Sequence, residues 1–69
     1  MQISRERVEI LMAERQINPK ELVHAAGISY PTLGRAYVGK SKPVTVGRIA
    51  RALGVDVVDI LREVEIKEE

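Results

Sequence analysis

Residues 18–38 read NPKELVHAAGISYPTLGRAYV, and this stretch carries the signals for two short helices and the turn between them. Asn18 is a good N-cap, Pro19 suits the first helical position, and Glu21 stands where the acid of a capping box belongs. The helical period then turns three apolar side chains inward, those of Leu22, Val23 and Ala26. Gly27 follows them and predicts the end of this first helix, because glycine readily adopts the left-handed conformation found there.

The second helix of this stretch begins almost at once. Only Ile28 separates Gly27 from Ser29, a second N-cap residue, which predicts a helix over residues 30–38 with Leu33, Ala36 and Tyr37 as its buried side. Pro31 is tolerated in a first helical turn, although it disfavours α geometry at Tyr30 and leaves a start one residue later open. About three residues, one of them glycine, thus join two helices, which is the spacing of a helix-turn-helix.

The chain before this stretch predicts one further helix, over residues 5–14, with Ser4 as its N-cap. Its buried stripe follows the helical period and consists of Val8, Leu11, Met12 and Arg15. After residue 38, Gly39 ends a helix and Pro43 prevents its continuation, so residues 39–43 are expected to form a loop.

Two more helices are predicted beyond this loop. Thr45 is expected to cap the first, which ends at Gly54 and has as its inward residues Val46, Ile49, Ala50 and Leu53. Asp56 is expected to cap the last, whose inward residues are Val57, Ile60 and Leu61, with Val64 on the same side just beyond the core. The prediction is an all-α, five-helix domain over residues 1–63, followed by a short acidic tail over residues 64–69.

Charge is distributed unevenly, although the formal net charge is only +1. Residues 22–55 contain no Asp or Glu, and their five cationic residues are Arg35, Lys40, Lys42, Arg48 and Arg51. The acidic residues lie before and after this segment. A cationic segment of this kind indicates either a surface that binds a polyanion or an ordinary solvated face.

Length and composition exclude several classes of protein. A chain of 69 residues without cysteine has a small core and no disulfide or thiolate metal site. No apolar run approaches the length of a membrane span and the start lacks a signal-peptide core, so a cytoplasmic protein is expected. Residues 34–41 match the P-loop pattern, but a helix is predicted before them and Pro43 stands where the P-loop helix would be. His24 is the single histidine. Neither an enzyme nor a bound cofactor or metal is therefore expected.

The exposed face predicted for residues 29–38 contains groups that can read base edges. Arg35 can donate two hydrogen bonds to guanine, and Tyr30 can donate one or pack on a thymine methyl. Ser29 and Pro31 share this face. Gly34 costs its helix about 1 kcal/mol relative to alanine, a cost that close approach of DNA would explain. This face contains no acidic residue.

Gly27-Ile28-Ser29, Leu33, Gly39 and the segment ALGVDVVDIL at residues 52–61 resemble the phage repressor and Cro-type helix-turn-helix family, also called the xenobiotic-response-element family. The resemblance covers roughly residues 5–63. It implies a lambda-repressor-like domain of five helices that binds double-stranded DNA as a homodimer. It also implies that the main base-reading positions are Tyr30, Pro31 and Arg35, flanked by Ser29 and Gly34.

The same resemblance implies contacts to phosphate and to a second copy of the chain. The phosphate-contacting candidates are the loop and helix-start residues Asn18, Lys20, Lys40, Lys42, Thr45 and Val46. Apolar residues outside the predicted core suggest a dimer contact, and they are Ile10, Val58, Val64 and Ile66. A transcriptional repressor is the predicted function. A protein-interaction module, such as an antitoxin or anti-repressor, and an excisionase-like accessory DNA protein remain alternatives.

Overall fold

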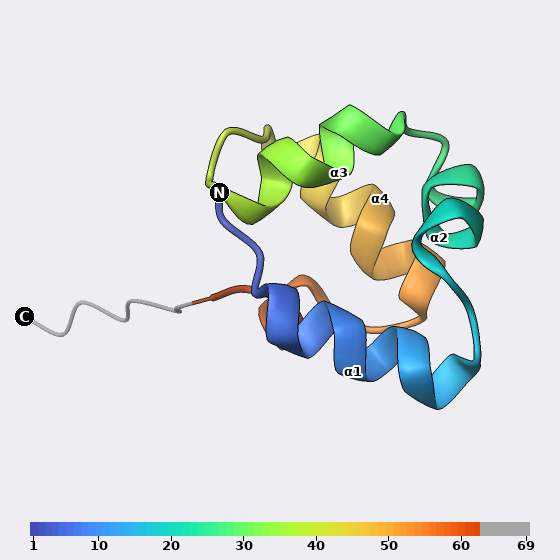
Figure 1. Ribbon diagram of the computed structural model, residues 1–69. Coiled ribbons are helices and arrows are strands. Elements are labelled where there is room, and N and C mark those ends of the chain that lie inside the picture. The colour runs from blue at the N-terminus through green and yellow to red at the C-terminus, as the bar shows by residue number, and fades with distance from the viewer. Residues whose placement is uncertain (63–69) are drawn as a thin grey trace, which may run out of the picture.

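The computed structural model describes residues 1–62, which fold into four α-helices and one short 3-10 turn (Figure 1). The elements in chain order are α1 (Arg5–Arg15), α2 (Pro19–Ala26), α3 (Tyr30–Tyr37), α4 (Pro43–Leu53) and a 3-10 helix (Val57–Asp59). Figure 1 shows α1 and α3 on opposite sides of the molecule, α4 between them and α2 at one end. Helix α2 packs against α4 and α3, and α4 also contacts the 3-10 turn.

The predicted caps of the first three helices are confirmed. The Ser4 hydroxyl accepts the Arg7 N–H at 3.2 Å, and the Ser29 hydroxyl accepts the Thr32 N–H at 3.3 Å. Asn18 accepts the Glu21 N–H at 2.8 Å while the Glu21 carboxylate accepts the Asn18 N–H, a complete capping box. These bonds satisfy backbone donors that a helix start otherwise leaves without partners.

The helix ends were predicted equally well. Gly27 and Gly54 end α2 and α4 with φ of 69° and 73°, in the left-handed region where a side chain would be strained. Gln16 ends α1 in the same region, at φ 55°, although it is not a glycine.

The predicted start of α4 was wrong. Helix α4 begins at Pro43, with Lys42 as an N-cap that makes no side-chain capping bond, so Thr45 lies inside the first turn. The reason is that proline already has the φ of a helix and lacks the N–H that the first helical position would leave unbonded. Pro43 therefore begins this helix, and does not only end the preceding loop.

The predicted fifth α-helix is also corrected, within residues 1–62, to a single 3-10 turn. Asp56 does form its capping box, because the Asp59 carboxylate accepts the Asp56 N–H at 3.1 Å. The chain then extends, and Leu61 forms an antiparallel bridge with Ile3. Val64, expected on the same helix, lies outside the described residues, as does the acidic tail over 64–69.

The core follows the predicted helical stripes with one exception. The buried side chains are Ile3, Val8, Met12, Leu22, Val23, Ala26, Leu33, Ala36, Val46, Ile49, Ala50, Leu53 and Ile60. Leu11 and Tyr37 are half-buried against them. Arg15, predicted on the buried stripe of α1, is exposed, because its guanidinium reaches back to the Leu11 carbonyl at 3.3 Å and stays in water.

The first and last described segments lie side by side and close the domain. The Ser4 N–H donates to the Ile60 carbonyl at 2.6 Å, and the Arg62 N–H donates to the Gln2 carbonyl at 3.1 Å. The Ile3 N–H donates to the Ala36 carbonyl at the end of α3. The N-terminal segment therefore connects α3 to the C-terminal end of the described chain.

Candidate nucleic-acid interface

Three residues, Gly27 to Ser29, join α2 to α3. The Ile28 N–H donates to the Val23 carbonyl at 3.1 Å, and the Ile28 side chain is half-buried against the core. Ser29 is extended and caps α3 directly. This short, internally bonded turn fixes α3 relative to α2 and leaves the opposite side of α3 in solvent.

Every predicted base-reading residue of α3 and of its N-cap is exposed. Ser29, Tyr30, Pro31, Gly34 and Arg35 are all exposed, while Leu33 and Ala36 hold the helix to the core. No residue of α3 is acidic. The helix thus presents a polar and cationic surface without a carboxylate to repel phosphate.

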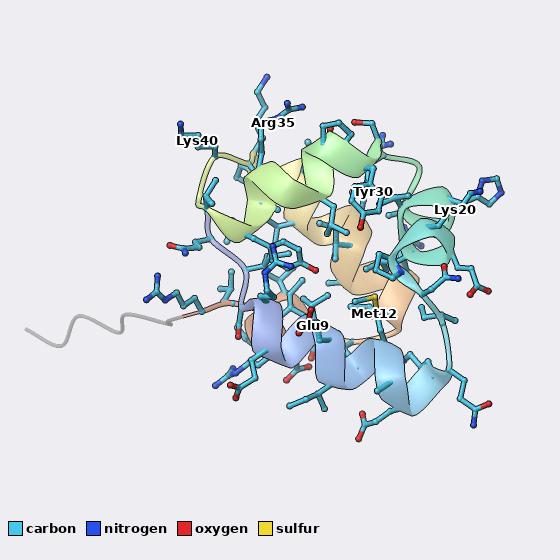
Figure 2. All side chains as sticks on the ribbon, viewed as in Figure 1. Glu9, Met12, Lys20, Tyr30, Arg35 and Lys40 are labelled. Atoms are coloured by element: carbon cyan, nitrogen blue, oxygen red, sulfur yellow. The ribbon has the colours of Figure 1, made fainter. Side chains whose placement is uncertain are left out.

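Tyr30 and Arg35 do not point in the same direction, since five residues of α-helix place two side chains about 140° apart. Figure 2 shows Arg35 extending away from the molecule and Tyr30 on the side of α3 nearer α1. There Tyr30 lines a small pocket of about 160 Å³ together with Arg5, Glu9 and Tyr37. Of these two side chains, Arg35 is therefore the one that points away from the rest of the domain.

Arg35 is also held in place. Its guanidinium Nη2 donates to the Thr32 hydroxyl at 3.1 Å, and the Thr32 and Ser29 hydroxyls are hydrogen-bonded to each other at 2.7 Å. The sequence analysis did not identify Thr32. The available signal was its spacing, because residues three apart on a helix are neighbours on its surface.

Tyr37 joins α3 to α1. The Arg5 guanidinium lies over the Tyr37 ring, 4.2 Å from its centre, in a cation–π contact. Burial raises the pKa of the Tyr37 phenol, Arg5 opposes part of that rise, and Glu9 and Tyr30 add smaller contributions that raise it. This contact orients the inner side of α3.

Gly34 has free space around it. A Cβ built on Gly34 would meet no heavy atom within 4 Å apart from its chain neighbours and the backbone of its own helix, and the backbone there is an ordinary helix. Neither packing nor conformation within the domain therefore requires a glycine at this position.

The loop after α3 holds the two predicted lysines. Gly39 has φ of 84°, and the Lys40 N–H donates to the Arg35 carbonyl at 2.9 Å, so Lys40 starts directly beside the end of α3. Lys40 and Lys42 are exposed. Figure 2 shows Lys40 and Arg35 extending from the same side of the molecule.

The N-terminal segment supports this loop. The Gln2 amide donates to the Tyr37 carbonyl at 2.9 Å, and the Gln2 side chain lies 3.5 Å from where a Cβ of residue 39 would be. The Ser41 hydroxyl donates to the Met1 carbonyl at 2.7 Å. The loop is thus bonded on one side to residues 1 and 2.

At the start of α4, Val46 is poorly placed for its predicted phosphate contact. Val46 is fully buried, and its N–H donates to the Lys42 carbonyl at 3.2 Å. The Thr45 N–H donates to the same carbonyl at 3.0 Å, although the Thr45 side chain is half-buried and near the surface. Because α4 starts at Pro43, the residue with its N–H at the first turn and an exposed side chain is Val44, which the sequence analysis missed.

At the start of α2, Asn18 and Lys20 are both exposed. The Asn18 Oδ1 is engaged in the capping box, so any phosphate contact from this residue uses its amide nitrogen as donor. Figure 2 shows Lys20 extending from α2, beyond the end of α3 opposite to Lys40. Cationic groups therefore stand at both ends of α3.

Two of the four residues predicted at a dimer contact lie in the described part of the chain. Ile10 and Val58 are each 52% exposed, which is high for large apolar side chains. Val64 and Ile66 lie outside the described residues.

Three further features of the described residues bear on nucleotide binding, metal binding and membrane insertion. Residues 34–41, which match the P-loop pattern, form the second half of α3 and the following loop. Among residues 1–62 there is no group of three His, Asp or Glu side chains that could hold a metal ion. None of the described helices is long and apolar enough to span a membrane.

Comparison with known protein families gives a match that covers most of the chain. Residues 7–65 match the model of the Cro/C1-type HTH DNA-binding domain. A comparison with curated proteins found no match. The matched residues include α2, α3, α4 and most of α1, and this all-helical architecture agrees with such a domain. The chain belongs to the Cro/C1-type helix-turn-helix DNA-binding family.

Proposed function

We propose that this protein is a sequence-specific transcriptional repressor that inserts α3 into the major groove of double-stranded DNA. The single observation that carries the proposal is the outer side of α3, which has no acid, points Arg35 outward, and has exposed lysines beyond both ends. A major groove admits an α-helix, and an arginine can donate two hydrogen bonds to one guanine there.

In this proposal, α2 and α3 are the two helices of the helix-turn-helix. Arg35, Pro31 and Ser29 face the bases on the outer side of α3, the exposed Tyr30 reads a base from the side of the helix nearer α1, and Gly34 lets the groove wall approach the helix closely. Lys20, Lys40, Lys42 and the Asn18 amide contact phosphates and fix the register. The Val44 N–H replaces the contact predicted for Val46.

A homodimer is the proposed binding unit, with the domain over residues 1–63 and the acidic tail over 64–69 kept as predicted. Ile10 and Val58 are the described candidates for its contact, because both are exposed apolar side chains that a second copy would remove from water. Two copies would meet half-sites about 34 Å apart. Sedimentation of Ile10→Asp and Val58→Asp variants tests this step, and wild-type protein that stays monomeric on operator DNA contradicts it.

The experiment that tests DNA binding is a fluorescence-anisotropy titration with a random duplex at several salt concentrations, followed by selection of the operator from a random pool. Binding that weakens steeply with salt is expected, because lysine and arginine displace counterions from phosphates. Negligible binding at low salt would overturn the proposal and favour a protein partner. Tight binding that does not regulate a promoter but bends DNA would favour an accessory role in recombination.

A further inference from the structure

We propose that Thr32 is a specificity-determining positioning residue, which acts by holding the Arg35 guanidinium in the orientation that reads a base. This inference rests on the proposed function of α3. It adds a residue that neither the base-reading nor the phosphate-contacting set includes.

The geometry is a chain of three side chains along one side of α3. The Arg35 Nη2 donates to Thr32 Oγ1 at 3.1 Å, and Thr32 Oγ1 lies 2.7 Å from Ser29 Oγ. Ser29 is itself fixed, because its hydroxyl also accepts the Thr32 N–H as the cap of α3. The guanidinium is therefore connected through two hydroxyls to the helix start.

The direction of the hydrogen bonds follows from the donors. Arginine can only donate, so Thr32 Oγ1 is an acceptor towards Arg35 and has one hydrogen left to donate. If the Thr32 hydroxyl donates to Ser29, the Ser29 hydroxyl hydrogen is left without a partner in the protein, and Ser29 is exposed. If Ser29 donates to Thr32, it is the hydroxyl hydrogen of the half-buried Thr32 that is left without one. The first arrangement costs less, because an exposed donor can bond to water. It also makes Ser29 an outward donor in the free protein.

The hydrogen bond to Thr32 leaves the Arg35 guanidinium with donors for a base. A guanidinium has five N–H donors, so four remain for the two parallel bonds that guanine accepts. A long side chain that is already held loses less rotamer freedom when it binds. The expected benefit of Thr32 is therefore in binding to the operator, where Arg35 reads a base, and not in binding to random DNA.

The test compares Thr32→Val, which removes the hydroxyl and keeps the shape, with Thr32→Ser, which keeps the hydroxyl. Thr32→Val should weaken operator binding by about threefold to tenfold, the cost of ordering one long side chain. Random-duplex binding, the salt dependence and the melting temperature should not change. Thr32→Ser should restore most of the operator affinity. In an Arg35→Ala background, Thr32→Val should have no further effect.

A measurement without DNA separates this inference from the proposed function. The NMR order parameter of the Arg35 side chain should fall in Thr32→Val and recover in Thr32→Ser. An unchanged order parameter would overturn the inference whatever the protein binds, and so would a loss of operator affinity that persists in the Arg35→Ala background. If the wild-type protein shows no preference for any duplex, the proposed function itself fails, and Thr32 has no role in specificity.

Discussion

Helices α3 and α4 are built in similar ways and differ in what they present to solvent. Each has a proline in its first turn and an interior glycine whose added Cβ would meet no heavy atom within 4 Å apart from its chain neighbours and the backbone of its own helix. Helix α4 buries four side chains, whereas α3 buries two and has a side-chain cap that α4 lacks. The comparison indicates that α4 serves as the packing scaffold, whereas α3 leaves more of its surface free for the DNA contact that we propose.

The largest expected difference lies between one arginine of each helix. Arg35→Ala should weaken operator binding by about 1–3 kcal/mol and relax discrimination at one base pair, because it removes two bonds to a base. Arg51→Ala is the matched control in the last turn of α4, and it should change operator binding little. Anisotropy titrations with the operator and a random duplex check both. Equal losses on the two duplexes for Arg35→Ala would contradict a base-reading role.

The two interior glycines allow a comparison in which stability and binding change in opposite directions. Gly34→Ala and Gly47→Ala should each stabilise the fold by about 1 kcal/mol, because alanine is the better helix former and the added methyl has room. Only Gly34→Ala should weaken DNA binding, since only that methyl would enter the groove. Urea unfolding and operator titration measure the two effects. Full DNA affinity in Gly34→Ala would show that no close approach occurs there.

A smaller effect is expected from the loop between the two helices. Lys42→Ala should weaken binding to operator and random duplex alike and reduce the slope of log affinity against log salt by about one, because one phosphate contact is lost. Arg7→Ala on the exposed side of α1 is the control and should leave the slope unchanged. A sequence-dependent loss for Lys42→Ala would indicate that the loop reads bases.

The accuracy of the sequence predictions depended on the range of the interactions involved. The caps at Ser4, Asn18 and Ser29 and the ends at Gly27 and Gly54 involve residues within one helical turn, and the sequence predicted all of them. The start of α4 is also local, but there the backbone restriction of Pro43 outweighs the side-chain cap expected at Thr45. The later predicted start also placed Val46 among the phosphate-contacting candidates, although its side chain is buried.

The features that the sequence could not predict join distant parts of the chain. The extended pairing of Leu61 with Ile3 ends the last helical turn, and it links residues 58 positions apart. The Arg5 contact with Tyr37 likewise depends on how α1 and α3 pack. Within the candidate site, the exposed positions on α3 followed from helical periodicity. The direction of Tyr30 and the restraint on Arg35 depended on side-chain geometry that periodicity does not specify.

The smallest predicted effect concerns the contact between α3 and α1, in which the Arg5 guanidinium lies over the Tyr37 ring, whereas the buried side chains of α4 are all aliphatic. Burial raises the pKa of the Tyr37 phenol, so the folded state favours its neutral form. The resulting stability is fully present below the ordinary tyrosine pKa of the unfolded chain and is lost as the pH rises through the higher pKa of the folded state. In a Tyr30→Phe variant, which retains Tyr37 as its one tyrosine, the ultraviolet absorbance of the phenolate should therefore appear above the usual pH. Adding Tyr37→Phe should remove this part of the loss of stability at alkaline pH. If the phenolate absorbance of the Tyr30→Phe variant instead has its midpoint at or below the ordinary tyrosine pKa, Tyr37 is more open to water than its place between α1 and α3 implies.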